Sequence, residues 1–189
     1  KAELFADSIL QLSEENNYTK GIGLGQLNNG LLEQIKSNYN LAINHNEKAL
    51  AIFTTIKNDT LLAKTYAALG TNYWQKSEYD KAMQYQLKAL KINERLNLKN
   101  EIAVCYNYIS MIYQTKYQLK EAEEFANKSF SIIKNEKPSR SHISTYHNLA
   151  NIFGMQANYK DALAMDSIGL KLCEQLNIEF NKSMFYDNI

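Results

Sequence analysis

The chain has 189 residues, of which 45% are hydrophobic and 22% charged, the composition of an ordinary folded protein. Lys and Arg number 21 against 20 Asp and Glu, and a net charge of +1 gives no field that would steer the chain toward nucleic acid. No apolar run reaches the roughly 18 residues that a membrane span needs. We therefore expect no nucleic-acid binding and no membrane contact by this segment.

The sequence repeats itself with a period of 40 residues. When it is shifted by 40 positions, aromatic, aliphatic and alanine positions coincide without any insertion. Periods of this length are typical of helical-repeat proteins, in which each repeat contacts only its neighbours. The clearest columns are Tyr66, Tyr106, Tyr146 and Tyr186; Leu69, Ile109, Leu149 and Ile189; Ala42, Ala82, Ala122 and Ala162; and Leu50, Leu90, Phe130 and Leu170.

Taken in chain order, the predicted elements are all helices. Residues 1–17 have the pattern of the second helix of an incomplete repeat, and residues 181–189 begin a further first helix. Neither end carries the polar cap that a solenoid normally has, so we expect residues 1–189 to be a single array cut from a longer one. The predicted full repeats span residues 18–59, 60–99, 100–139 and 140–180.

The repeat at residues 60–99 shows a two-helix pattern most clearly. One apolar stripe at helical spacing runs from Tyr66 to Tyr73, and a second begins at Tyr79 after a break in phase at Ser77. Asp59 is placed to cap the first of these helices. The pattern predicts helix pairs near residues 60–97, 100–135 and 141–177.

This repeat closely resembles the tetratricopeptide signature. The family's aromatic, Leu-Gly, Tyr, Ala and Ala-Leu positions are matched in three strings: Tyr66-Ala67-Ala68-Leu69-Gly70-Thr71-Asn72-Tyr73, Tyr79-Asp80-Lys81-Ala82 and Lys88-Ala89-Leu90. HEAT and armadillo repeats are of similar length but lack these strings, and the usual tetratricopeptide unit of about 34 residues is lengthened here to 40. The resemblance implies an all-α fold, a right-handed superhelical solenoid of antiparallel helix pairs.

The chain also departs from the family pattern. Ser37, Ser77, Tyr117 and Ala157 stand where a glycine usually ends the first helix of each repeat. The first helix of the repeat at 18–59 instead contains four glycines, each of which weakens a helix by about 1 kcal/mol. We expect that helix to be the softest in the chain or to begin late. The glycines are Gly21, Gly23, Gly25 and Gly30.

No pattern of catalytic, metal-binding or cofactor-binding residues emerges. The run from Gly21 to Gly25 lacks the preceding strand and the spacing of a dinucleotide loop, and His142 and His147, five apart, do not share a helical face. Cys105 and Cys173 each fall within a helical pattern and are predicted to be small buried residues. His45 shares a column with Tyr85, Phe125 and Met165 and is predicted to be a packing residue. We expect this segment to be no enzyme and to need no metal or cofactor.

The resemblance places the far side of the first helices in a concave groove that receives a protein or peptide. Amide side chains there can pair with a peptide backbone, and Trp74 and Met111 offer apolar anchors. The predicted groove residues are Lys64, Thr71, Trp74, Gln75, Asn107, Met111, Gln114, His147 and Asn151.

The period and composition resemble the repeat regions of bacterial two-component sensor histidine kinases and related regulators. That resemblance implies a sensing or interaction region, with homodimerisation as a further possibility, and it favours an extracytoplasmic (periplasmic) location over a cytoplasmic one. Two alternatives stay open: a plain scaffold without signalling output, and a regulator like the peptide-pheromone receptors.

Overall fold

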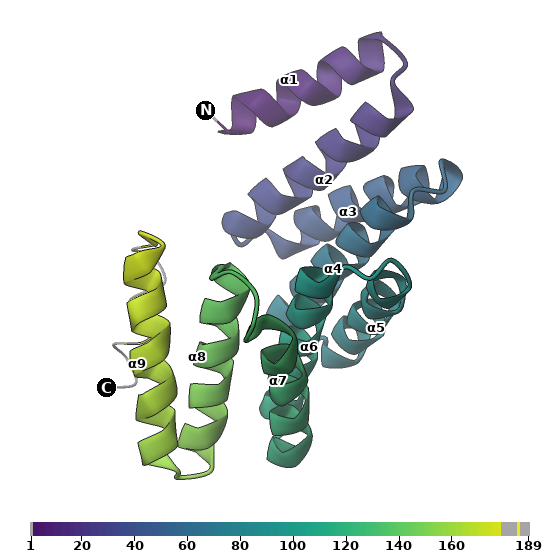
Figure 1. Cartoon of the computed structure of the whole chain (residues 1–189). Coiled ribbons are helices and arrows are strands. Elements are labelled where there is room, and N and C mark those ends of the chain that lie inside the picture. Colours follow the sequence, from purple (N-terminus) through teal and green to yellow (C-terminus); the bar gives the residue numbers. More distant parts are fainter. Residues whose placement is uncertain (1, 179–184, 186–189) are drawn as a thin grey trace. The chain divides into compact units, whose positions relative to one another are not determined.

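The computed structural model describes residues 2–178 and 185, with side chains for residues 8–178 and 185. Over these residues the chain forms nine helices and no strand (Figure 1). The three helix pairs predicted near residues 60–97, 100–135 and 141–177 are confirmed, and the outer limits of each pair lie within two residues of the predicted ones. The helices are α1 (Ala2–Glu15), α2 (Thr19–Ile35), α3 (Tyr39–Thr55), α4 (Asp59–Gln75), α5 (Tyr79–Arg95), α6 (Lys99–Thr115), α7 (Leu119–Ile133), α8 (Arg140–Met155) and α9 (Tyr159–Gln175).

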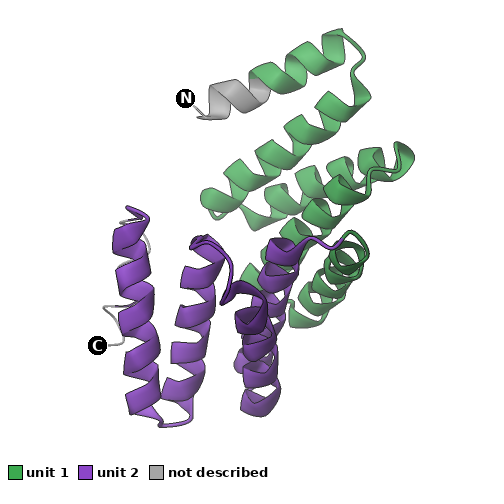
Figure 2. Cartoon of the chain, viewed as in Figure 1, with its two compact units in different colours: residues 1–96 green, residues 97–189 purple. Residues whose placement is uncertain are grey.

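The chain divides into two compact units, residues 1–96 with α1–α5 and residues 97–189 with α6–α9 (Figure 2). We call them unit 1 and unit 2 and describe each by itself. Within unit 1, α2 packs on α3 and α4 on α5; within unit 2, α6 packs on α7 and α8 on α9. The first helices of neighbouring repeats also touch, α2 with α4 and α6 with α8. Residues 181–189, predicted to begin a further first helix, lie outside the described residues except for Phe185.

The turns between helices repeat every 20 residues with one backbone conformation. One residue in each of these turns has a positive φ, between 52° and 63°, and none of these residues is glycine. In the turn after α4, for example, Ser77 N–H donates to the carbonyl of Trp74 and Glu78 N–H to that of Tyr73, the pair of bonds that ends a helix in a left-handed residue. The left-handed residues are Asn17, Ser37, Lys57, Ser77, Asn97, Tyr117, Ala157 and Asn177.

The link between α7 and α8 is the exception to this period. It contains Pro138, the only proline, and α7 ends at Ile133. Pro138 has no N–H to donate, so a link is where it harms no helix. His142 then closes the start of α8: its Nδ1 accepts from the backbone N–H of Ser139, and its Nε2 lies 2.8 Å from the carbonyl of Ile133.

The predicted cap of α4 is wrong by one residue. Asn58 holds the cap position, and its side-chain oxygen accepts from the N–H of Leu61 at 3.0 Å. Asp59 is instead the first helical residue, where its charge suits the helix dipole, and it pairs with Arg95 at 2.8 Å. Asparagine and aspartate cap about equally well, so their order in the chain did not decide between them.

The glycine-rich helix α2 begins on register at Thr19, which corrects the expectation of a late start. Its four glycines are its only fully buried described residues. A methyl group at Gly23 would lie 2.5 Å from the ring of Phe53, and one at Gly25 would lie 3.0 Å from the side chain of Leu10. The glycines therefore let α2 approach its neighbours closely, and this contact offsets their poor helix propensity.

Aromatic rings join the two helices of a pair. In unit 1, Tyr85 stacks on Tyr73 with centroids 5.4 Å apart, and Lys88 lies over both Tyr85 and Tyr66. In unit 2 the ring of Phe125 stacks in the same way on Tyr113 at 5.5 Å. The first repeat replaces these rings with a polar contact, because His45 Nδ1 lies 2.7 Å from the side-chain oxygen of Gln26. His45 is thus a packing residue, as predicted from its column.

We predict that Ala82→Leu lowers the stability of the fold by about 1–3 kcal/mol, because Ala82 is 0% exposed where α4 and α5 meet and has no room for a larger side chain. Thermal unfolding followed by circular dichroism should show a lower Tm with helicity retained at low temperature. Gln84→Leu, on the exposed side of the same helix, is the control and should leave the Tm nearly unchanged.

A second prediction concerns the left-handed turns. Tyr117 has a φ of 56° and is 81% exposed, so its side chain adds backbone strain and little packing. Tyr117→Gly should raise the free energy of unfolding by about 0.5–1 kcal/mol, measured by urea denaturation. Tyr117→Ala keeps a Cβ and should gain nothing; an equal gain from both variants would show that the aromatic ring, not the φ angle, is the cost.

Candidate binding surfaces

The nine predicted groove residues divide between the two units. Lys64, Thr71, Trp74 and Gln75 lie on α4 of unit 1, and the other five lie on α6 and α8 of unit 2. Their exposure differs widely, although one spacing rule selected them all.

On α4 of unit 1, Lys64 and Gln75 are exposed and Trp74 is partly buried. The indole Nε1 of Trp74 is buried and makes no hydrogen bond within the described part of the chain. Thr71 is only 7% exposed, and its hydroxyl donates to the carbonyl of Ala67 at 3.0 Å. Lys64, Trp74 and Gln75 can therefore meet a partner, while Thr71 belongs to the packing of its own helix.

Asn107 in unit 2 is buried rather than open, in contrast to its predicted place on a groove face. It is 4% exposed, and its amide donates to the hydroxyl of Thr145 at 2.8 Å, which joins α6 to α8. Ser129 on α7 completes the junction, with its hydroxyl 3.0 Å from that of Thr145 and donating to the carbonyl of Ala103. The column spacing could not show this, because the neighbouring first helix and not solvent meets Asn107.

Gln114 is partly buried in the same junction. Its amide donates to the side-chain oxygen of Asn148, and the amide of Asn148 reaches the carbonyl of Asn107 at 3.4 Å. The contact uses one edge of the Gln114 side chain, and the residue also lines a hollow in unit 2. Gln114 thus links the packing of α6 on α8 to an accessible surface.

His147 and Asn151 lie one turn apart on α8 and contact one another. The Asn151 amide lies 3.1 Å from His147 Nε2, and the ring of Phe185 meets the His147 ring edge to face at 5.5 Å. Burial lowers the pKa of His147 below the value of about 6.5 usual for histidine. A neutral ring can accept from Asn151 at Nε2, whereas a protonated one cannot.

The space that Phe185 occupies is made by Gly169 on α9. Phe185 is 0% exposed, and any side chain at Gly169 would overlap its ring. Phe185 packs there with Ile143 and Cys173, so the predicted burial of Cys173 is confirmed, as is that of Cys105. The other full repeats carry Ala or Ser in the column of Gly169 and Gly, Thr or Cys in that of Phe185, so only the structure shows that these two positions face one another.

An open hollow of about 600 Å³ lies on α8 and α9 of unit 2. Its lining includes the amide side chains of Gln114 and Asn151 and the exposed side chains of Met155, Tyr159 and Leu163. Gly154 is part of its wall and has no other atom within 4 Å of the place a methyl group would take. Gly154 shares a column with Trp74 and Gln114, so the hollow stands where other repeats carry a large side chain.

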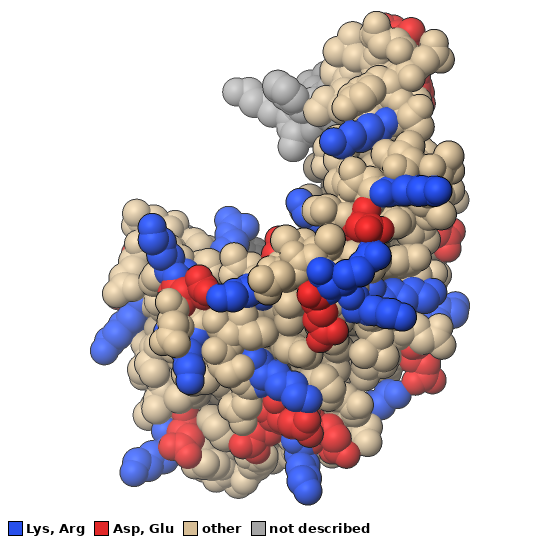
Figure 3. All heavy atoms as spheres, turned by 45° about the vertical axis from the view of Figure 1, so that its right-hand side comes forward, with Lys and Arg blue, Asp and Glu red and all other residues tan. Residues whose placement is uncertain are grey.

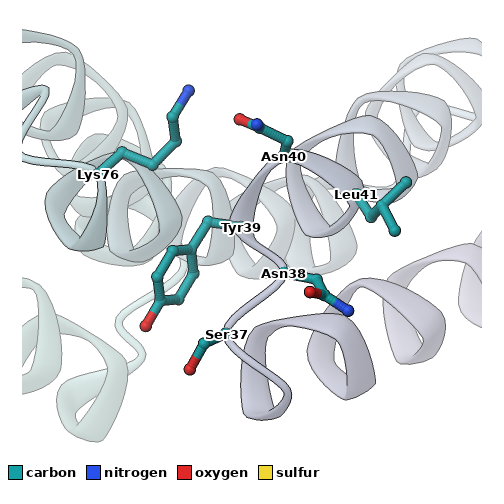
Figure 4. A pocket seen from close by; sticks show the side chains of 6 residues that line it. All are labelled: Ser37, Asn38, Tyr39, Asn40, Leu41 and Lys76. Atoms are coloured by element: carbon teal, nitrogen blue, oxygen red, sulfur yellow. The ribbon is translucent and has the colours of Figure 1, made fainter.

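A smaller hollow of about 380 Å³ lies in unit 1 at the turn between α2 and α3 (Figure 4). Tyr39 and Ser37 point to one side of the turn, while Asn40 and Lys76 point to the other. Lys76 is paired with Glu78 at 2.8 Å. Side chains that diverge in this way do not converge on a ligand, and we assign the hollow no role.

The predicted groove residues all lie on α4, α6 and α8, yet α2 also carries an exposed surface in the equivalent columns. Leu24, Leu31 and Ile35 occupy on α2 the columns that Lys64, Thr71 and Gln75 occupy on α4.

 Leu31 is 54% and Ile35 72% exposed, whereas Thr71 is buried and Gln75 is polar. The 40-residue register alone identifies Leu31 and Ile35 as the counterparts of predicted groove positions, so the column comparison is the signal that finds them.

Charge and metal-ligating groups single out no further site. Figure 3 shows Lys and Arg interspersed with Asp and Glu over the visible surface, in keeping with the net charge of +1. Within the described residues, no three His, Cys, Asp or Glu side chains are grouped as metal ligands. A search of the same residues finds no helix with the length and apolar character to cross a bilayer.

Comparison with protein families decides the identity of the repeat. Two family models, both described as tetratricopeptide repeat, match residues 22–95 and 102–135. The chain belongs to the tetratricopeptide repeat family. The family resemblance of the strings around Tyr66 and Tyr79 is thereby confirmed. Among curated proteins, no sequence matches the chain.

Solved structures share this all-α repeat fold at low sequence identity. BtubC (BKLC) from P. vanneervenii is 18% identical with a TM-score of 0.76, over 98% of this chain and 82% of that one. RapI is 16% identical with a TM-score of 0.77, over 98% and 75%. Aspartyl phosphate phosphatase F from Bacillus subtilis is 19% identical with a TM-score of 0.71, over 88% of this chain but only 45% of that one. At these identities the likeness shows the fold alone, and it confirms the predicted all-α class of helical solenoids.

We predict that His147 makes stability depend on pH. The pKa of His147 is lower in the folded chain than in the unfolded chain. As the pH falls, the unfolded chain therefore binds a proton at His147 before the folded chain does. Protonation thus favours unfolding, and the free energy of unfolding decreases below about pH 6.5. The Tm of the native chain should therefore fall more than that of His147→Gln between about pH 6.5 and 5. If the Tm of the two proteins changes with pH in the same way, His147 has the same pKa in the folded and unfolded chains, and the prediction is wrong.

Proposed function

We propose that the chain is a non-catalytic domain that binds a protein or peptide on the exposed faces of its first helices. The observation that carries the proposal is the hollow in unit 2, whose lining from α6, α8 and α9 combines two amide side chains with three exposed apolar ones. Amide side chains can hydrogen-bond to the backbone of a bound peptide, and Met, Tyr and Leu can pack against the side chains of that peptide. Membership of the tetratricopeptide family supports this reading, because its helical repeats form extended binding surfaces.

The hollow has the form of a seat for a helix. One repeat earlier in unit 2, Ile152 of α8 packs against Ala122 and Ala126 of α7. Ala162 and Asp166 hold the equivalent positions on α9, and both line the hollow. A helical segment with an apolar side chain, from a partner or from a neighbouring repeat, is therefore the kind of occupant that this surface accommodates.

In unit 1 the proposed contact face is that of α4, with Trp74 as its anchor and Lys64 and Gln75 beside it. We further propose, on resemblance, that the domain is the sensing or interaction region of a larger bacterial signalling protein such as a two-component sensor histidine kinase. A plain scaffold and a regulator like the peptide-pheromone receptors are the alternatives. The single array over residues 1–189 and a homodimer remain predictions.

We expect peptides selected against the chain from a random phage-displayed library to use these faces. For a peptide bound in unit 1, Trp74 fluorescence should shift, and Trp74→Ala should weaken binding by roughly 1 kcal/mol or more. For one bound in unit 2, Gly154→Leu should fill the hollow and weaken binding by a similar amount. Isothermal titration calorimetry gives both affinities.

Two controls separate binding from folding. Gly154→Ala adds a methyl group in open space and should leave affinity unchanged while favouring the helix. Lys91→Ala, on the exposed side of α5, should also do little, and it is a cleaner control than Lys88, which lies over two tyrosine rings. Selected peptides that are insensitive to both Trp74→Ala and Gly154→Leu contradict the proposed faces.

A further inference from the structure

The pattern of α2 in unit 1 is partly inverted. Its fully buried described residues are all glycines, while Leu31 and Ile35 are 54% and 72% exposed. An amphipathic helix normally turns its large apolar side chains inward and its small and polar ones outward. Departures from the usual amphipathic pattern are found mainly at functional sites, which favours a role for this surface in binding.

One face of α2 carries a row of side chains that we call the α2 stripe; Lys20, Leu31 and Ile35 are exposed, and Leu24 and Leu27 are partly buried. Lys20, Leu24, Leu27, Leu31 and Ile35 follow one another at intervals of three or four residues, so all five lie along one face of the helix. Leu24, Leu27 and Leu31 have the a, d, a spacing with which one helix packs against another. From Lys20 to Ile35 the stripe is about 22 Å long at 1.5 Å per residue, the length of about four helical turns.

The one charged residue of the α2 stripe is Lys20, and the neighbouring helix α4 contributes Lys64. Lys20 and Lys64 are both exposed, and neither makes an ion pair within the described residues. Lys64 occupies on α4 the column of Leu24 on α2, and these two helices are in contact. The carboxylates of the same two helices are used elsewhere, since Glu33 pairs with Lys36 and Asp59 with Arg95.

We propose that the α2 stripe docks an amphipathic helix of a partner protein, with apolar side chains on Leu24, Leu31 and Ile35 and acidic side chains toward Lys20 and Lys64. This inference rests on the proposed function and deepens it. It specifies the partner as an acidic amphipathic helix and adds α2 to the contact faces of unit 1. The positive end of the α2 dipole lies beside Lys20 and favours the same acidic group.

Two synthetic peptides test the charge requirement. Both are helical and about three heptads long with Leu at a and d, and they differ only in carrying Glu or Lys at the flanking positions. Fluorescence anisotropy should show that the Glu peptide binds the native chain at least about tenfold more tightly than the Lys peptide, with the difference shrinking in high salt. Equal binding of the two would overturn the proposal by showing only apolar adhesion.

Matched substitutions locate the site. Leu31→Thr with Ile35→Gln gives α2 the residues that α4 carries in the same columns, and it should weaken Glu-peptide binding at least about tenfold. Leu41→Thr is the control, because Leu41 is also 54% exposed but lies on α3. Lys20→Glu with Lys64→Glu should reverse the peptide preference, whereas Lys48→Glu on α3 should not. All these side chains are exposed, so each variant should fold with unchanged helicity.

Further outcomes keep this inference separate from the proposed function. If sedimentation shows that the native chain dimerises and that Leu31→Thr with Ile35→Gln makes it monomeric, the stripe is a self-interface and the partner helix is excluded. If Leu41→Thr weakens binding as much as the double substitution does, the stripe is not the site. Glu-peptide binding that depends on the stripe supports the inference even if the selected peptides are insensitive to Trp74→Ala and Gly154→Leu, a result that contradicts only the two other faces.

Discussion

Close approach of helices at small side chains is the constraint on which the rest of this structure depends. Ala42, Ala82 and Ala122 are all 0% exposed, one in each of three consecutive second helices. At such positions two helix backbones can pack at short distance, and a larger side chain has no free volume to enter. The pairs so formed set the rotation of every helix, and thereby decide which side chains remain exposed for contact.

At two other helix contacts a glycine on one helix faces a large side chain on the other. Gly70 leaves room for Gln86, which is fully buried and donates to the carbonyl of Ala67 at 3.3 Å. Gly169 likewise leaves room for Phe185. In both cases the missing side chain on one helix makes room for a large one on the other, as dense packing requires. Such pairs are invisible in a single column, because each column follows only one of the two partners.

Exposure of function-bearing residues follows from these junctions and not from helical phase alone. Asn107 and Gln114 project from α6 toward α8, so their amides hold two first helices together. Leu31 and Ile35 project from α2 into solvent although they are apolar. The polar junction and the apolar surface together reverse the usual distribution; on α2 the contact positions are held by buried glycines.

The sequence by itself determined the helix pairs, their 40-residue period and the family, because periodic apolar spacing is a local property that the backbone geometry of a helix translates directly into a buried face. Only the tertiary structure decided that Asn107 is buried, that Asn58 and not Asp59 caps α4, and that the glycines of α2 are contact points. These depend on what a neighbouring helix places opposite each residue, and no spacing within one helix contains that information.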